Sequence, residues 1–258
     1  MPAPKIKRSS TATMPATTEI LKMRFGARWA LSLAALVALT VGSLVGRHFV
    51  SNAPAPSATP PPAINGYVLE NPRALSPATL VDDQGAPFSM TDFAGHWSFV
   101  YFGYTYCPDV CPLSLLELAA VKKRLLARMP DVAVRYYFVS VDPARDTPER
   151  LHSYVAYFDS DFRGLTGSVP ELTQFAAETG SLFLIPEGQD KDSYLITHSS
   201  NMTVLDPTGK LAAVITPPHE PENIATDFAK IVAYRSDLSG LEAGSRAPKA
   251  IAKSYASR

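Results

Sequence analysis

The sequence contains little cysteine, two residues out of 258. Two cysteines cannot build a disulfide scaffold, and they cannot supply all four ligands of a Cys₄ zinc site. The sequence also lacks an excess of charge of either sign, because 24 basic residues balance 24 acidic ones. A zero net charge argues against a uniformly basic nucleic-acid-binding protein. We therefore expect no nucleic-acid partner.

Apolar residues, in contrast, are plentiful. They make up 46% of the chain, with 10% aromatic residues, which is enough to bury a sizeable core. A wholly disordered chain is therefore excluded. The length allows one domain with extensions, or at most two small domains.

The neutral total conceals an uneven distribution of charge. Residues 1–28 hold six basic residues and one acidic residue, and residues 239–258 carry a net +3. The segment between, residues 48–238, holds 13 basic and 22 acidic residues, a net charge of −9. We expect an acidic domain that prefers partners with basic docking faces.

Residues 29–46 form an uncharged apolar run that follows the basic segment 1–28. As a helix, such a run would span roughly 27 Å, close to the minimum for crossing a membrane. The positive-inside rule then places residues 1–28 in the cytoplasm and exports the rest. We predict a single-pass protein of a bacterial-type inner membrane, with a periplasmic C-terminal domain.

Two alternatives compete with a retained transmembrane anchor. A buried core helix is disfavoured by the flanking Arg28 and Arg47. A cleaved signal peptide normally has an apolar region of about 7–15 residues and a small-residue cleavage site, whereas this run is longer and Arg47 follows it. Residues 47–66 are rich in Pro, Ala and Ser, and they predict a semi-rigid linker between the anchor and the domain.

The pattern of residues 67–238 predicts a three-layer α/β domain. A dense β-branched and aromatic run is typical of a central strand, and apolar residues at helical spacing indicate the helices. We expect a hairpin around residues 83–85, a second around 206–209, and a mobile basic tail at 239–258. The predicted strands are 98–104 and 132–142, and the predicted helices are 112–129, 147–158, 170–179 and 221–234.

Both cysteines lie in the segment YCPDVCP, directly after the central strand and at the entry to its helix. Cys107 and Cys111 are four positions apart, so one helical turn places both sulfurs on one side. The helix N-terminus favours thiolate over thiol. The pair therefore suits a structural disulfide, a redox dithiol or a soft-metal site. A static disulfide would close a very small loop and add little stability by chain entropy.

Three segments together resemble the Sco/SenC family of copper chaperones, namely YFGYTYCPDVCP, VSVDPARDTPERL and SYLITHSSNMTVLDPTG. The resemblance covers residues 71–234, and the predicted anchor agrees with it. It implies a thioredoxin-like fold with a central mixed sheet. The cysteine motif departs from the C-x-x-C of thioredoxins by one additional residue.

The resemblance implies a copper site formed by Cys107, Cys111 and His198. Two thiolates and one imidazole form a soft, three-coordinate site suited to Cu(I). We expect the other histidines, at positions 48, 96, 152 and 219, to be solvated or satisfied elsewhere. A structural zinc site would need a fourth ligand, which the sequence does not point to.

Other residues near the motif receive structural assignments. Asp109 is expected to cap the helix or tune the thiolates. Met202 is expected in the core. Asp142, Arg145 and Asp146 match the family's DPxRDT stretch, and we assign them to loop structure without a chemical role.

The resemblance implies a membrane-anchored chaperone that delivers copper to the copper-receiving subunit of a terminal respiratory oxidase, after loading by an upstream donor. The alternative is a thiol:disulfide oxidoreductase that keeps a partner's metal-binding cysteines reduced. A peroxidase of the thioredoxin superfamily is a third, weaker reading. Whether the protein is an enzyme is left open by the sequence.

Overall fold

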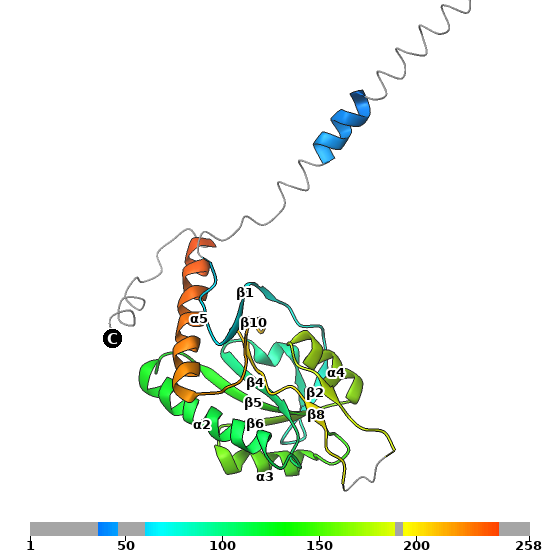
Figure 1. The fold of residues 1–258 in the computed structure, drawn as a ribbon, viewed down its shortest axis with the longest axis vertical. Coiled ribbons are helices and arrows are strands. Elements are labelled where there is room, and N and C mark those ends of the chain that lie inside the picture. Colours follow the sequence, from blue (N-terminus) through cyan, green and yellow to red (C-terminus); the bar gives the residue numbers. More distant parts are fainter. Residues whose placement is uncertain (1–35, 46–59, 189–192, 243–258) are drawn as a thin grey trace, which may run out of the picture. The chain divides into compact units, whose positions relative to one another are not determined.

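The structure is a computed structural model that describes residues 36–45, 60–188 and 193–242. The chain divides into two units, Met1–Pro56 and Ser57–Arg258. Figure 1 shows the second unit as a sheet flanked by helices.

In the first unit, residues 36–45 form a helix whose apolar side chains are exposed, among them Leu36, Leu39 and Leu44. Within the described residues, no helix is both long enough and apolar enough to cross a membrane. The predicted anchor at 29–46 extends beyond these residues at both ends, and most of the predicted linker lies outside them. The anchor therefore stays a prediction.

The second unit is organised around one eight-stranded mixed sheet with strand order β1-β10-β9-β4-β5-β6-β2-β3. Strands β4, β5 and β6 run parallel, and the neighbouring pairs on both sides are antiparallel. The mixed sheet expected from the sequence is confirmed. The strands are β1 (Gly66–Arg73), β2 (Thr79–Asp82), β3 (Pro87–Ser89), β4 (Trp97–Gly103), β5 (Val134–Ser140), β6 (Arg163–Thr166), β9 (Met202–Leu205) and β10 (Leu211–Ile215).

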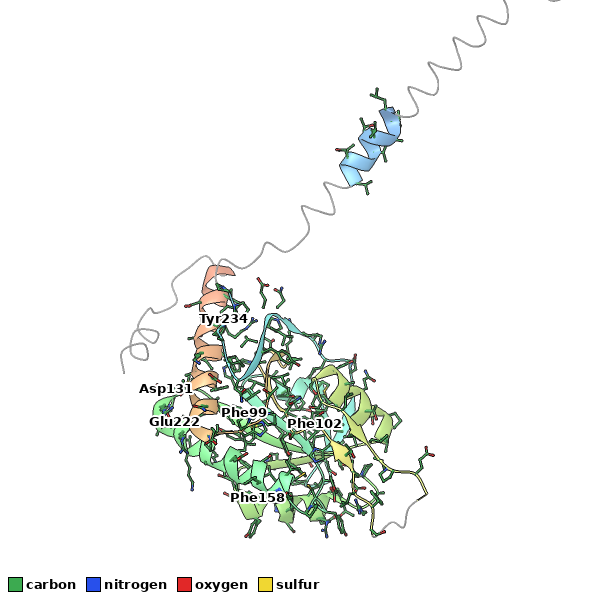
Figure 2. All side chains as sticks on the ribbon, viewed as in Figure 1. Phe99, Phe102, Asp131, Phe158, Glu222 and Tyr234 are labelled. Atoms are coloured by element: carbon green, nitrogen blue, oxygen red, sulfur yellow. The ribbon has the colours of Figure 1, made fainter. Side chains whose placement is uncertain are left out.

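The central strand β4 is buried along its whole length, as its sequence WSFVYFG predicts for a strand covered on both faces. Alternate side chains point to opposite faces. Phe99 packs on Phe228 of helix α5 (Pro221–Glu242), and Phe102 packs edge-to-face on Phe175 of helix α4 (Val169–Glu178). Figure 2 shows Phe99 on the α5 side and Phe102 on the α4 side. Helices therefore cover both faces of the sheet, which gives the predicted three layers.

The helices begin and end at residues suited to those positions. In α3 (Pro148–Phe158), Thr147 accepts a hydrogen bond from the Arg150 amide and proline occupies the first turn. Ser168 caps α4 (Val169–Glu178) in the same way. A short 3₁₀ helix, η1, spans Met90–Phe93.

Helices α2 (Val110–Arg128) and α5 (Pro221–Glu242) pack against each other. Arg124 and Arg128 of α2 both pair with Glu222 of α5. The α5 helix runs through Glu242, four residues into the segment predicted as a tail, and residues 243–258 lie outside the described part of the chain. The N-terminal end of the domain is also attached to α5, because the Asn65 amide donates to Asp227. The last residues of the predicted linker are therefore bound to the domain.

Both predicted hairpins are present. Strands β2 and β3 pair across the turn at Asp83–Gly85, and β9 pairs with β10 across the turn at Asp206–Gly209. The sequence did not predict β1, β6 or the two-residue strands β7 (Phe183–Leu184) and β8 (Thr197–His198), which form a separate small sheet. Strand β8 is the element that presents His198.

Candidate metal centre

The cysteine loop, residues 104–109, connects β4 to α2. Its turn is closed by a hydrogen bond from the Cys107 amide to the Tyr104 carbonyl, 3.2 Å long. Cys111 is the second residue of α2, and its amide donates to the Cys107 sulfur at 3.4 Å. Asp109 occupies the N-cap position, but its side chain makes no capping hydrogen bond. Asp109 therefore lies at the predicted cap position, but its side chain does not cap the helix. The Cys107 sulfur accepts an amide hydrogen bond of the first turn instead.

Cys111 is fully buried against the end of β4. A Cβ atom at Gly103 would lie 2.7 Å from the Cys111 sulfur and 2.8 Å from the Phe138 ring. Glycine at this position therefore leaves the space that the sulfur occupies. The role of Gly103 was not predicted from the sequence, although a glycine that ends an otherwise bulky strand, YFG, is a signal for a close approach of this kind.

His198 reaches the cysteines from a distant part of the chain. Strand β8 pairs with β7 so that His198 lies opposite Phe183. Its Nε2 atom lies 3.2 Å from the Cys111 sulfur, and its Nδ1 lies 2.9 Å from the Ser199 carbonyl oxygen. A carbonyl oxygen only accepts, so Nδ1 carries the proton and Nε2 presents its lone pair toward the sulfur. This is the tautomer that a metal ligand bound through Nε2 requires.

Two tyrosine rings orient the imidazole. Tyr101 and Tyr104 meet His198 nearly edge-on, with ring centroids 6.2 Å and 5.8 Å away and interplanar angles of 83° and 89°. Neither Tyr101 nor Tyr104 was predicted from the sequence to belong to the site. They stand at the end of β4 directly before the cysteines, which places them beside whatever the cysteines bind.

The three predicted ligand residues thus converge. One ligand atom from each of Cys107, Cys111 and His198 lies within 4.8 Å of the other two. Both cysteines are free thiols, so the structural disulfide is not formed in this structure. In the described part of the chain, no fourth Cys, His, Asp or Glu joins this cluster. The donor set, two sulfurs and one imidazole nitrogen, fits a soft metal in three-coordination better than tetrahedral zinc.

Burial sets the protonation of the site. It raises the pKa of the Cys111 thiol well above its ordinary value, more than the hydrogen bond between Cys111 and Tyr104 lowers it. The expectation that the helix N-terminus makes this cysteine a thiolate is therefore wrong for Cys111, because desolvation by burial raises the pKa of its thiol. Burial also lowers the pKa of His198, so the imidazole stays neutral and free to bind a metal.

The other histidines in the described residues lie away from the cluster. The Nε2 atom of His96 lies 3.1 Å from the Tyr137 hydroxyl, His152 lies beside Asp83, and buried His219 lies 3.8 Å from Glu117. His48 lies outside the described residues. Met202 is fully buried in β9, so its predicted place in the core is confirmed.

Proteins of known sequence resemble this chain over the same region. A protein of Stutzerimonas stutzeri, named as copper-binding, is 34% identical over 157 residues, which cover 60% of this chain and 74% of that protein. The mitochondrial SCO1 homolog 1 of Arabidopsis thaliana is 33% identical over 154 residues, which cover 60% of this chain. The match spans about half, 46%, of that longer relative.

Solved structures share the fold. The crystal structure of Arabidopsis thaliana ScoI with copper bound is 32% identical, with a TM-score of 0.57, and the match covers 61% of this chain and 97% of that one. A second structure is that of BsSco, a member of the Sco family of cytochrome c oxidase assembly proteins in which a disulfide switch was identified. It is 25% identical to this chain, with a TM-score of 0.50. That match covers 64% of this chain and 96% of the other.

The fold and the site together define a thioredoxin-like domain with a Cys-Cys-His cluster at the start of its first long helix. The SCO1/SenC family model matches residues 69–233. This chain belongs to the SCO1/SenC family, as its sequence motifs predict.

Proposed function

We propose that this protein is an exported, membrane-anchored copper chaperone that passes copper to a terminal respiratory oxidase during its assembly. The observation that carries the proposal is the convergence of Cys107, Cys111 and His198, with Nε2 of the histidine directed at a cysteine sulfur. Copper is bound in the related Arabidopsis structure, and thiolates are the ligands that select Cu(I). The oxidase as recipient is supported by the assembly role stated for BsSco.

The proposed location has its support in the sequence. The basic segment 1–28 and the apolar run 29–46 together favour a single transmembrane helix with the domain on the periplasmic side. An anchored domain would meet a membrane-embedded oxidase in the same plane. The acidic charge of residues 48–238 would favour a recipient with a basic docking face.

Copper is the cargo, and its transfer proceeds by ligand exchange. Cys107 is partly exposed, whereas Cys111 is fully buried, so an incoming thiolate or imidazole of the partner reaches the Cys107 side of the site first. Displacement of one ligand at a time keeps the copper bound throughout. Because both sulfurs must be reduced and deprotonated to bind, copper binding releases protons and fails when the pair is oxidised.

Metal analysis of the reduced full-length protein, purified without oxygen, tests the proposal. We expect one copper per chain, and its loss in the variant Cys107→Ser/Cys111→Ser. Ser76→Ala, a change at a residue that bonds Glu178 away from the cysteines, serves as a control that retains copper. Equal copper content in the cysteine variant and the natural chain would refute the proposal.

The second candidate function is a thiol:disulfide oxidoreductase. It is favoured by the two free thiols and by the partial exposure of Cys107, which permits attack on a partner disulfide. In that reaction the Cys107–Cys111 dithiol is oxidised to a disulfide, and the partner disulfide gains the two electrons and two protons. The disulfide switch stated for BsSco supports it.

A His198→Ala variant separates the two functions. A chaperone should lose copper affinity steeply while thiol–disulfide exchange survives. An oxidoreductase should show slowed exchange with unaltered copper retention. A reduction potential measured for both proteins completes the comparison.

A further inference from the structure

Arg145, in the loop after β5, lies between the two chain segments that supply the metal ligands. One is the cysteine loop, and the other is the histidine segment, residues 193–199. The Arg145 guanidinium carbon lies 3.6 Å from the ring centroid of Tyr194, 4.6 Å from that of Tyr106 and 5.8 Å from that of Tyr104. Only 6% of the Arg145 side chain is exposed, so the guanidinium is shielded from water, although Tyr106 is itself 42% exposed.

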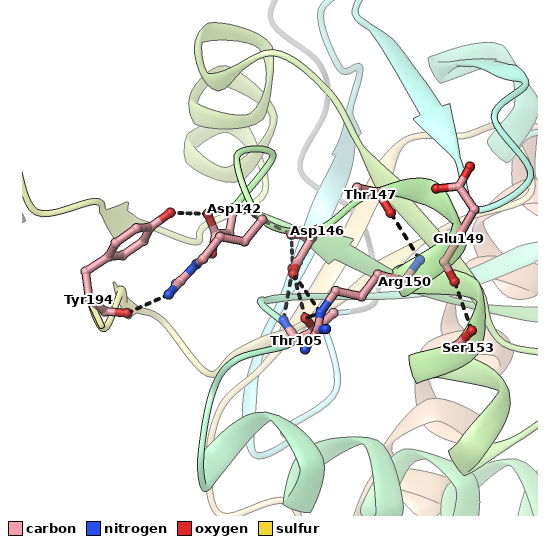
Figure 3. A network of polar contacts seen from close by, with 10 residues as sticks. Thr105, Asp142, Asp146, Thr147, Glu149, Arg150, Ser153 and Tyr194 are labelled. Atoms are coloured by element: carbon pink, nitrogen blue, oxygen red, sulfur yellow. Dashed lines mark hydrogen bonds and ion pairs between the residues drawn. The ribbon is translucent and has the colours of Figure 1, made fainter. Parts of the chain in front are cut away.

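Polar contacts fix Arg145 on the histidine side. Its Nε pairs with Asp142 at 2.5 Å, and its Nη1 donates to the Tyr194 carbonyl oxygen at 3.1 Å. The Tyr194 hydroxyl donates to the same Asp142 carboxylate, so the tyrosine is held at both ends, as Figure 3 shows for Tyr194 and Asp142. The remaining nitrogen, Nη2, is buried without a hydrogen-bond acceptor. Aromatic faces around the guanidinium supply the attraction that this nitrogen otherwise lacks.

A second arginine, Arg150, contacts the cysteine loop. Arg150 lies 4.0 Å from the Tyr106 ring centroid, and its Nε donates to the Thr105 hydroxyl. Buried Asp146 accepts hydrogen bonds from both the amide and the hydroxyl of Thr105, as seen in Figure 3. Arg150 also lies 3.9 Å from Asp146, which is itself bonded to the cysteine loop through Thr105.

The histidine segment is also attached to the fold through β7, Leu182 and Tyr104. Strand β8 contributes two residues of pairing with β7, and the Ser199 amide donates to the Leu182 carbonyl. Leu195 is 63% exposed, whereas Tyr194 and Ile196 are buried. Tyr104 connects the two sides, since its ring contacts both Arg145 and His198. The position of Tyr194 against Arg145 therefore contributes to where His198, four residues later, meets the cysteines.

We propose that Arg145 is a positioning residue that holds His198 at the copper site by clamping Tyr194 against the cysteine loop. This inference rests on the proposed copper-binding function. It assigns a role to the DPxRDT stretch, which the sequence left as plain loop structure. Arg145 contacts both ligand segments, whereas the contacts of Arg150 are with the cysteine loop and Asp146.

A double-mutant cycle on the full-length, reduced protein tests the assignment, with Cu(I) affinity measured by competition with a chromophoric chelator. Arg145→Lys keeps the charge but removes the flat face that stacks on the tyrosines. We expect it to weaken Cu(I) binding by about ten-fold, typical of a residue that orients a metal ligand. In the His198→Ala background the same change should have a much smaller effect, because only the contacts of Arg145 with Tyr104 and Tyr106 of the cysteine loop remain relevant.

Arg150→Lys is the matched control. Because Arg150 contacts the cysteine loop, its effect on Cu(I) affinity should be the same with and without His198. Equal effects of Arg145→Lys in both backgrounds, or no effect in the natural background, would overturn the inference alone. A natural chain that binds no copper, or a His198→Ala variant of unchanged affinity, would overturn the proposed function and the inference with it.

Two further measurements keep the test decisive. If Arg145→Lys does not fold, as judged by circular dichroism, Tyr194→Leu replaces it in the cycle, with the same expected pattern. In the Cu(II)-loaded protein, electron paramagnetic resonance should show coupling to a histidine nitrogen that is weakened by Arg145→Lys and retained in Arg150→Lys. Undiminished nitrogen coupling in Arg145→Lys would contradict the proposed role.

Discussion

Nε2 of His198 lies 3.2 Å from the sulfur of Cys111, although 87 positions separate the two residues in the sequence. The imidazole proton is on Nδ1, held by the Ser199 carbonyl, and the histidine is neutral because burial lowers its pKa. The site is therefore organised for a metal on its nitrogen side before any metal binds. On its sulfur side, the Cys111 proton must first leave.

A substitution at Gly103 tests whether space at the end of β4 shapes the site. Gly103→Ala would place a Cβ atom 2.7 Å from the Cys111 sulfur, so the sulfur must move. We expect a loss of about 1–3 kcal/mol in the free energy of unfolding, as for other overpacked cores, together with weaker Cu(I) binding. Chemical denaturation and chelator competition measure the two effects.

Gly167→Ala is the control for this substitution. Its Cβ would lie 2.8 Å from the Leu80 side chain, which makes it comparably crowded but remote from the cysteines. It should destabilise the fold and leave Cu(I) affinity unchanged. If both variants weaken copper binding alike, the effect at Gly103 is general destabilisation.

The two cysteines should differ in reactivity. Cys107 is partly exposed, whereas Cys111 is fully buried with a raised pKa, and only the thiolate reacts with alkylating agents. Iodoacetamide applied to the folded, reduced chain should therefore label Cys107 first. Peptide mapping by mass spectrometry, with Cys107→Ser and Cys111→Ser as references, identifies the site. Faster labelling of Cys111 would contradict the described burial.

The raised pKa of Cys111 makes the stability of the metal-free protein depend on pH. Above the ordinary thiol value of 9.0, the unfolded chain loses this proton while the folded chain retains it. The unfolded state is then favoured, so the free energy of unfolding falls as pH rises from 9, by at most about 1.4 kcal/mol per pH unit for one proton. Cys111→Ala should show a shallower decline.

Urea denaturation between pH 8 and 10 measures this slope. Burial also raises the pKa values of Tyr101 and Tyr136, so these residues too lower the free energy of unfolding at high pH. The relevant quantity is therefore the difference in slope between the natural chain and Cys111→Ala. Identical slopes for the two proteins would mean that the Cys111 thiol ionises as easily in the fold as outside it.

A histidine titration examines the nitrogen ligand. Burial lowers the pKa of His198 below its ordinary value of 6.5, so its protonation midpoint in the metal-free chain should lie below that value. Nuclear magnetic resonance of the imidazole Cε1–H, assigned with His198→Ala, gives the midpoint. A midpoint at or above 6.5 would indicate a solvated ring.

The sequence predicts the parts of this molecule that depend on local pattern. Strand β4 is recognisable in the sequence because it is a dense run of aromatic and β-branched residues, and every residue from Trp97 to Gly103 is indeed buried. Helix α3 is recognisable because Thr147 and Pro148 mark its start. The short strands β7 and β8 escape prediction, since two residues carry no periodicity. Their pairing depends on partners supplied by the fold.

The candidate site divides in the same way. The cysteine motif and the resemblance were enough to select His198. The thiolate expectation for Cys111 failed because burial, which no local pattern reveals, raises the pKa of its thiol. The role of Arg145 was missed because its main partner, Tyr194, lies 49 positions along the chain.

The coordination of Cu(I) in the full-length, reduced protein tests the central claim most directly. X-ray absorption spectroscopy of the copper-loaded chain should show two sulfur neighbours and one nitrogen neighbour. The nitrogen should disappear in His198→Ala, and both sulfurs in Cys107→Ser/Cys111→Ser. A copper environment without sulfur, or one that is unchanged in these variants, would contradict a copper site formed by Cys107, Cys111 and His198.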